Sequence, residues 1–269
     1  MKTLIKNINW KLKGVKTKKE IKEKLALSGA YPPVVILQMG KVASQSIWRS
    51  LDKQYQGFVV HTHSFLKKDD FITAKQANKY LKINALCDHF ESDDYKGLKI
   101  ISLVREPIGR NVSAFFQNFN WRTGVKFKDQ DFPIEKIRDL FLTKINHEVP
   151  LTYFDHFKDK FDIDVYEKPF PAEGHEVIKA PRNVEMLLMR HDLDDDSKER
   201  LTGEFMGIKD FKLTNENIAS DKIYADTYSR FKSEVKLPAE YISKMKNSRY
   251  FQHFYDQYTI DKVCKKWSE

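Results

Sequence analysis

The segment from Tyr31 to Leu51 limits the folds open to this chain more than any other, because it reads as a strand, a tight turn and a helix in succession. Val34–Leu37 is an apolar run after two prolines, and its length suits a buried strand better than a helix. Further on, Ile47, Trp48 and Leu51 recur at helical spacing. A turn between such a strand and helix aims backbone N–H groups and the positive end of the helix dipole at one point, where an anion can bind.

The turn itself reads KVASQS and carries a lysine and two hydroxyls, at Lys41, Ser44 and Ser46. It departs from the Walker A sequence, because the lysine stands early and no Ser or Thr follows it to hold magnesium. The pattern resembles the 5′-phosphosulfate loop of sulfotransferases that use 3′-phosphoadenosine 5′-phosphosulfate (PAPS), and KVAS resembles their carbohydrate branch. This resemblance implies that the whole turn binds the 5′-phosphosulfate, through Lys41, Val42, Ala43, Ser44, Gln45 and Ser46. A solvated turn that binds nothing is the alternative for this motif taken alone.

A second motif, VREPIGRNVS, follows a third apolar run, Leu98–Val104, which is predicted to be a strand. Arg105 leaves the carboxyl end of that strand, and Ser113 stands eight residues later in a predicted helix. A guanidinium and a hydroxyl at this separation can converge on one phosphate. The segment resembles the 3′-phosphate motif of PAPS sulfotransferases, which implies that role for Arg105 and Ser113. The alternative is a structural ion pair and an incidental serine, and Arg110 either supports the pair or is an exposed helix residue.

A histidine pair, His61 and His63, follows a second short strand, Phe58–Val60. In-line sulfuryl transfer to a hydroxyl needs a base at the acceptor oxygen and positive charge at the leaving oxygen. Histidine suits the first role and Lys41 the second. An H-x-H at this place resembles heparan sulfate 2-O-sulfotransferase, where such a pair serves the acceptor. His61 is slightly favoured as the base because it is nearer the strand, and a surface-loop position is the alternative for His63.

Strand-like and helical patterns alternate along the chain, and candidate ligands follow the strands. This predicts an α/β, P-loop-type three-layer fold with a central, mainly parallel sheet covered by helices on both faces. Residues 31–269 are expected to form one domain behind a basic helical extension, residues 1–30. Further strands are predicted at Phe161–Phe170 and Val184–Met189, and a last helix around Tyr241–Tyr258. Four aromatic residues are expected in the core: Phe115, Phe116, Phe119 and Trp121.

The net charge of +9 is concentrated in residues 1–30, which hold nine lysines against two glutamates. The rest of the chain is nearly neutral, which argues against a nucleic-acid surface. The basic segment is either a solvated face or a peripheral contact with an anionic membrane. Cys87 and Cys264 are far apart in the sequence, so reduced thiols are expected. No apolar run suits a membrane span or a signal peptide, so we expect a cytoplasmic protein, with the inner face of the membrane as a further option.

The resemblance extends from about Tyr31 to the C-terminus, since Phe161–Phe170 and Glu185–Leu193 look like segments of bacterial capsular-polysaccharide-type sulfotransferases. It implies transfer of a sulfuryl group from PAPS to a carbohydrate hydroxyl of a capsular or other surface polysaccharide, or its precursor, with release of PAP. No metal is expected, because protein cations stabilise the transferred charge and two histidines alone are no metal signature. The alternatives are a divergent P-loop kinase or NTPase, and a non-catalytic module that docks on an anionic glycan or membrane.

Overall fold

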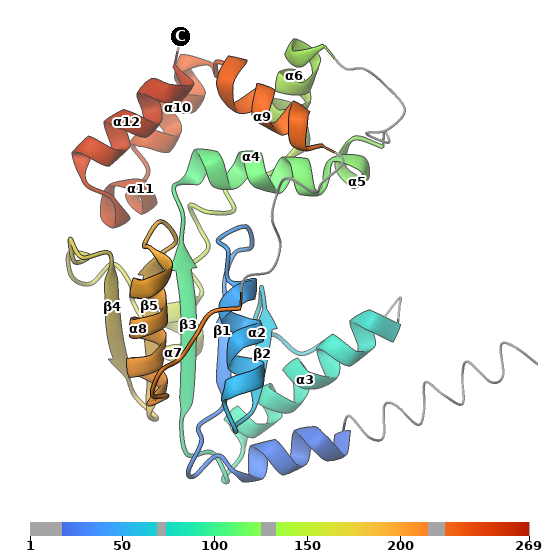
Figure 1. Cartoon of the computed structure of the whole chain (residues 1–269), viewed down its shortest axis with the longest axis vertical. Coiled ribbons are helices and arrows are strands. Elements are labelled where there is room, and N and C mark those ends of the chain that lie inside the picture. Colours follow the sequence, from blue (N-terminus) through green and yellow to red (C-terminus); the bar gives the residue numbers. More distant parts are fainter. Residues whose placement is uncertain (1–17, 69–73, 125–132, 215–223, 269) are drawn as a thin grey trace, which may run out of the picture.

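The computed structural model describes residues 18–68, 74–124, 133–214 and 224–268, and Figure 1 shows their arrangement around one sheet. The strand order is β2-β1-β3-β5-β4, and every neighbouring pair is parallel except β4 and β5. The strands are β1 (Val34–Leu37), β2 (Val59–Thr62), β3 (Leu98–Val104), β4 (His175–Ala180) and β5 (Val184–Arg190). The predicted α/β class with a mainly parallel sheet is confirmed.

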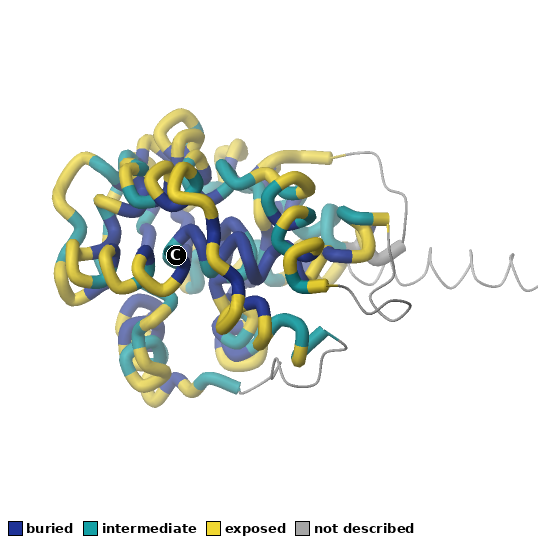
Figure 2. Tube along the Cα trace, turned by 90° about the horizontal axis from the view of Figure 1, so that it is seen from above, coloured by how far each residue is buried: buried dark blue, intermediate teal, exposed yellow. Residues whose placement is uncertain are grey.

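The central strands are buried on both faces, as their unbroken apolar sequences require. All four residues of β1 are completely buried, and in β3 only Lys99 is partly exposed. Parallel strands covered by helices on both sides have this composition, because neither face meets water. Figure 2 shows the buried segments gathered in the middle of the molecule, with exposed segments outside them.

Helices fill the connections between the strands and the C-terminal part of the chain. They are α2 (Gln45–Gln54), α3 (Ala74–Glu91), α4 (Pro107–Gln117), α5 (Phe119–Thr123), α6 (Ile134–Lys144), α7 (Phe157–Phe161), α8 (Asp195–Met206), α9 (Ala225–Glu234), α10 (Ala239–Lys246), α11 (Arg249–Phe254) and α12 (Gln257–Trp267). In Figure 1, α2 and α8 lie in front of the sheet, whereas α4 and α9–α12 lie above the carboxyl ends of the strands. Residues 18–26 form a further helix at the opposite end.

The chain reverses its winding direction at β1, and this reversal creates the place for a site. It moves from β1 to β2 on one side, then crosses back to β3 on the other. Right-handed crossovers then require α2 and α3 to cover opposite faces of the sheet. The connections that leave β1 and β3 therefore diverge, which opens a crevice at the carboxyl ends of these two strands.

Several local predictions are wrong. No strand covers Phe161–Phe170, because α7 ends at Phe161 and Asp162 takes a left-handed conformation (φ 56°) that starts a series of turns. The predicted helix around Tyr241–Tyr258 is divided into α10, α11 and α12, since Ser248 and Asp256 each cap a new helix with their side chains. Both residues accept the backbone N–H three positions later, which stabilises a helix start.

The strand β4 was missed, since its sequence HEVIKA lacks the apolar run of a central strand. It lies at the edge of the sheet, where polar residues are tolerated on the exposed side. Trp121 was wrongly assigned to the core, because its side chain is 81% exposed. The other three aromatic residues of that group, Phe115, Phe116 and Phe119, are buried as predicted.

The remaining expectations concern the chain ends and the thiols. Residues 1–17 of the basic extension lie outside the described residues. Cys87 and Cys264 are both buried, free thiols. Within the described ranges, no helix combines the length and the apolar character that crossing a membrane requires.

Tyr250 on α11 ties the C-terminal helices to the end of β3, and this contact can be tested. Its buried hydroxyl accepts a hydrogen bond from Arg105 N (3.1 Å) and donates one to Arg105 O (3.0 Å). Tyr250→Phe leaves both main-chain groups without this partner, so we expect the free energy of unfolding to fall by about 1–3 kcal/mol in urea denaturation. The control Tyr258→Phe removes a hydroxyl from a side chain that is 77% exposed and should change stability by less than about 0.5 kcal/mol. Equal losses in the two variants would contradict the assignment.

Candidate functional site

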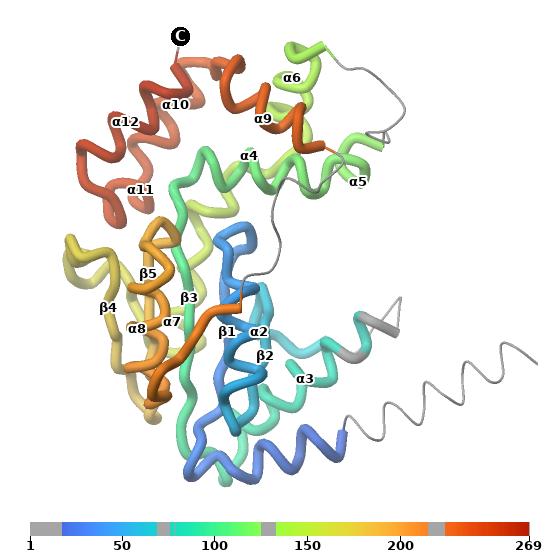
Figure 3. The backbone as a smooth tube through the Cα atoms, in the orientation of Figure 1, coloured from blue at the N-terminus to red at the C-terminus, as the bar shows by residue number. Residues whose placement is uncertain are grey.

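A cavity of about 410 Å³ opens at the crevice between the carboxyl ends of β1 and β3. Figure 3 shows the connection after β1 beside the start of α4. The residues that line the cavity are Gln38, Gly40, Lys41, Ala43, Ser44, Gln45, Ser46, His61, His63, Arg105, Ser113, Gln117, Tyr224 and Tyr228. The structure thus brings the predicted site residues to one cavity, apart from Val42, whose side chain is completely buried in the core.

The loop after β1 has an unusual backbone. Gly40, Lys41 and Ala43 all have positive φ angles, of 81°, 67° and 58°. For a residue with a β-carbon, this left-handed conformation costs about 1–2 kcal/mol, so the surrounding structure must hold it in place. At Gly40 the absence of a side chain removes this cost. A β-carbon there would lie 3.4 Å from Cε1 of His63, which is an ordinary van der Waals distance.

Two arginines from the β3–α4 segment hold this loop. Arg110 donates to the carbonyl oxygens of Met39 (2.8 Å) and Gly40 (3.4 Å), and Arg105 donates from Nη1 to the carbonyl of Lys41 (2.9 Å). The three consecutive carbonyls therefore face the guanidinium groups. Since peptide N–H and C=O bonds point in opposite directions, the following N–H groups face away from these cations.

The structure rules out one of the two predictions for Arg110. Its side chain is buried, so the prediction of an exposed helix residue is wrong, and the residue supports the loop instead. Burial lowers the pKa of Arg110 to about 10, which leaves it charged at neutral pH. A buried guanidinium with carbonyl partners is expensive to remove, because those carbonyls would lose charge-assisted hydrogen bonds.

The N-terminus of α2 opens on the cavity. Ser44 is its N-cap residue but makes no side-chain capping bond, and its hydroxyl lies 2.9 Å from Nε2 of His61 instead. Ser46 donates its hydroxyl proton to the carbonyl of Ala43 (3.2 Å). The first turn of α2 contains no acidic residue, so the positive end of its dipole is not neutralised there. Together with Lys41, this arrangement favours a bound anion.

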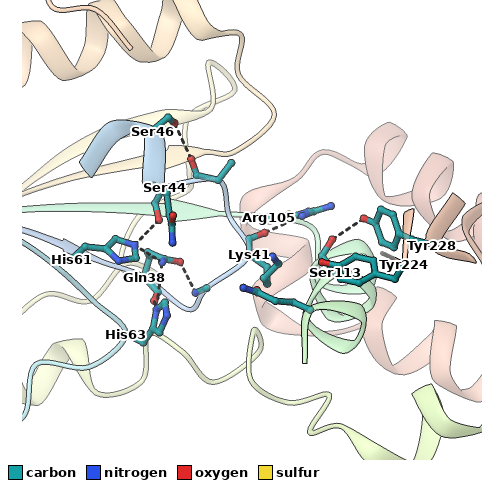
Figure 4. A pocket seen from close by; sticks show the side chains of 14 residues that line it. Gln38, Lys41, Ser44, Ser46, His61, His63, Arg105, Ser113, Tyr224 and Tyr228 are labelled. Carbon is teal, nitrogen blue, oxygen red and sulfur yellow. Dashed lines mark hydrogen bonds between the residues drawn. The ribbon is translucent and has the colours of Figure 1, made fainter. Parts of the chain in front are cut away.

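The two histidines lie at the end of β2 with Gln38 between them, as Figure 4 shows. Nε2 of Gln38 lies 3.0 Å from Nε2 of His61, and Nδ1 of His63 lies 2.8 Å from the carbonyl oxygen of Gln38. Burial, together with the nearby His63 and Lys79, lowers the pKa of His61 to about 3. Burial also lowers the pKa of His63, although its bond to the Gln38 carbonyl opposes the shift. Both rings are therefore neutral at pH 7.

Arg105 and Ser113 lie at the other side of the cavity in Figure 4. The hydroxyl of Ser113 lies 2.9 Å from that of Tyr228 on α9. Nε of Arg105 is buried and has no hydrogen-bond partner among the described residues. Such an unpaired donor is costly in a protein interior, and a bound anion would satisfy it.

Glu106, which stands beside Arg105, is committed to the helix rather than to the cavity. Both carboxylate oxygens accept from the backbone N–H of Gly109, at 2.8 and 2.9 Å, and so cap α4. A β-carbon at Gly109 would lie only 2.0 Å from Oε1 of Glu106, so glycine is required for this cap. Within the described ranges, no three His, Cys, Asp or Glu side chains form a group that could hold a metal ion.

Sequence analysis missed five residues of the cavity wall: Gln38, Gly40, Gln117, Tyr224 and Tyr228. Gln38 could have been noticed, since it is the first polar residue after a buried strand, where ligands gather in parallel sheets. The two tyrosines carry no local signal. They reach the cavity only because the C-terminal helices fold over the carboxyl end of the sheet.

Comparison with known families shows that part of the chain matches a family model. Residues 126–256 match the NKWYS family model, described as "Putative capsular polysaccharide synthesis protein". This segment is a little under half of the chain and includes Tyr224 and Tyr228 but neither phosphate motif. The match supports a capsule-related biosynthetic role without indicating a specific reaction. Comparisons with curated proteins and with solved structures found no match.

The lowered pKa of His61 predicts how stability depends on pH. The folded state keeps His61 neutral down to about pH 3, whereas the unfolded chain takes up a proton near pH 6.5. Its contribution to stability is therefore present above pH 6.5 and is lost as the pH falls toward 3. The free energy of unfolding, measured by urea denaturation at a series of pH values below 6.5, should therefore fall with decreasing pH. The fall should be steeper in the wild type than in His61→Gln, by up to about 1.4 kcal/mol per pH unit. Identical slopes would contradict a neutral, buried His61.

Proposed function

We propose that this chain is a PAPS-dependent sulfotransferase that acts on a carbohydrate hydroxyl during synthesis of a capsular or other surface polysaccharide. One observation carries the proposal: a single cavity is lined at one side by the lysine-bearing loop and the N-terminus of α2, and at another by Arg105 and Ser113. A nucleotide with phosphates at both its 5′ and 3′ positions needs two such anion sites at a fixed separation. The family match independently supports the capsule-related part.

The nucleotide would bind as follows. Lys41 and the N–H groups at the start of α2 hold the 5′-phosphosulfate, and Arg105 and Ser113 hold the 3′-phosphate. The unpaired Nε of Arg105 is a donor suited to that phosphate. Tyr224 and Tyr228 lie beside this end and offer aromatic surface for the nucleoside base. The hydroxyls of Ser46 and Ser113 must turn from their present partners to donate to the ligand.

The reaction is an in-line displacement at sulfur. The acceptor hydroxyl oxygen forms a bond to sulfur, while the bond from sulfur to the bridging phosphate oxygen breaks. The electron pair of that bond leaves with PAP, and Lys41 stabilises the charge that develops on the bridging oxygen. The acceptor proton passes to His61 or His63, both of which line the cavity and are neutral at pH 7.

A phosphoryl-transfer reading has less support. In that chemistry a hydroxyl after the lysine and an acidic residue near a strand end hold magnesium. Here Val42 follows Lys41 and is buried, and the carboxylate of Glu106 caps α4.

The proposal also includes a location. The two free thiols favour the cytoplasm, and the basic residues 1–30 would contact an anionic membrane surface there.

Binding of PAP tests the nucleotide part directly. We expect PAP to bind in isothermal titration calorimetry, with AMP and magnesium-ATP much weaker. Arg105→Ala should weaken PAP binding by about 10- to 100-fold, because it removes charge-assisted hydrogen bonds to the 3′-phosphate. The control Arg200→Ala removes an exposed arginine of α8 that pairs with Glu204, and should bind PAP like the wild type. A response to magnesium-ATP but not to PAP would favour a kinase, and no response to any of them would favour a docking module.

A substitution of Lys41 tests the chemical step separately from nucleotide binding. With radiolabelled PAPS and a panel of unsulfated polysaccharides, Lys41→Ala should lower kcat by about 10²–10³-fold, as loss of a group that stabilises developing charge does. The control Lys53→Ala changes an exposed lysine in the last turn of α2 and should keep full activity. Unchanged turnover in a folded Lys41→Ala protein would remove Lys41 from the mechanism.

A further inference from the structure

Gln38 is the first residue after β1, and its side chain is almost completely buried between the loop and the two histidines. Its Oε1 accepts the backbone N–H of Gly40. This bond fixes which way the amide points, because the N–H group can only donate and must face the oxygen. The amide nitrogen of Gln38 therefore faces His61.

The orientation of Gln38 determines the protonation of His61. An amide nitrogen can only donate, so Nε2 of His61, 3.0 Å away, must be the acceptor. A neutral imidazole carries its proton on the other nitrogen in that case, so His61 is the Nδ1–H tautomer. The hydroxyl of Ser44 lies 2.9 Å from the same Nε2, and the ring stacks on Trp48 with centroids 5.7 Å apart. The basic nitrogen of His61 is thus already occupied by protein donors.

His63 has the opposite arrangement. Its Nδ1 lies 2.8 Å from the main-chain carbonyl of Gln38, which can only accept, so Nδ1 carries the proton. The 3.4 Å contact between Nδ1 and the Gln38 amide nitrogen is then an approach of two donors, and the shorter distance decides the assignment. The lone pair of His63 is consequently on Nε2, and no hydrogen bond to Nε2 is found within the described residues.

We propose that Gln38 is a positioning residue that sets the tautomers of both histidines, with its side chain for His61 and its main chain for His63. His61 then holds the loop through Ser44, and His63 presents a basic Nε2 to the cavity. The role of His63 as the base rests on the proposed sulfuryl transfer, whereas the tautomers do not. Since Gly40 is bound to the Gln38 side chain and packs on His63, the same residue also fixes the base relative to Lys41.

Nitrogen-15 NMR of histidine-labelled protein reads the tautomers without any substrate, and His61→Gln and His63→Gln assign the signals. In the wild type, both rings should show a protonated Nδ1 and an unprotonated Nε2. An Nε2–H tautomer at either histidine would overturn the proposal, even if the protein transfers sulfuryl groups. The predicted tautomers in a protein that does not bind PAP would preserve the positioning role and remove the proposed function.

The substitution Gln38→Glu tests whether the side chain of Gln38 sets the tautomer of His61. The substitution keeps an acceptor for Gly40 but replaces the donor to His61 by a carboxylate, which can only accept. His61 should then carry a proton on Nε2, while His63 keeps its proton on Nδ1. The control Gln54→Glu makes the same change at the far, exposed end of α2, where Gln54 contacts Lys212, and should leave both histidine signals unchanged. An unchanged His61 signal in Gln38→Glu would overturn the assignment.

Kinetics distinguish the two histidines. His63→Gln should lower kcat by about 10²–10⁴-fold, the usual contribution of a general base, while PAP affinity stays within about 3-fold of the wild type. His61→Gln should retain more of the activity, because His61 supports the loop and takes no proton from the acceptor. A larger loss of kcat in His61→Gln than in His63→Gln would overturn the assignment of the base.

Discussion

The site depends on the hydrogen bonds that Arg105 and Arg110 donate to the main-chain carbonyls of residues 39–41. Without them, Lys41 and Ala43 would leave the left-handed conformation that residues with a β-carbon avoid. Arg105 is in turn held in place, because the hydroxyl of Tyr250 forms hydrogen bonds with both its main-chain N–H and its carbonyl oxygen. The C-terminal helices, the third strand and the loop after the first strand thus form one connected unit.

Burial and positive charge act together on the histidines. Desolvation lowers the pKa of both His61 and His63, although His63 is the more exposed of the two, and Lys79 lowers the pKa of each in the same direction. The same cations that keep the rings neutral favour an anionic ligand. A cavity of this kind combines an anion site with neutral imidazoles, which is the combination that proton removal beside a negatively charged donor requires.

The cavity joins two parts of the chain that differ in what they share with known proteins. The loops after β1 and β3 carry the two motifs singled out in the sequence. Tyr228 on α9 and Tyr224, which directly precedes α9, come from the segment that matches a capsule-synthesis family. Enzymes commonly keep a cofactor site on strand ends and vary the surrounding helices for the acceptor. In the proposed function, the helical segment instead completes the nucleotide end of the cavity through these two tyrosines.

The sequence by itself determined the first three strands, the helices after the two motifs and most of the cavity residues, because burial periodicity and the strand–turn–helix pattern are local signals. Only the tertiary structure revealed the edge strand β4, the hydrogen bond from Arg110 to the Met39 carbonyl, and the contact between Ser113 and Tyr228. These last two pairs lie 71 and 115 residues apart in the chain. No local pattern encodes such partners, since their meeting depends on how the helices pack over the sheet. Histidine tautomers belong to the same class, because they follow from which buried group happens to face each ring nitrogen.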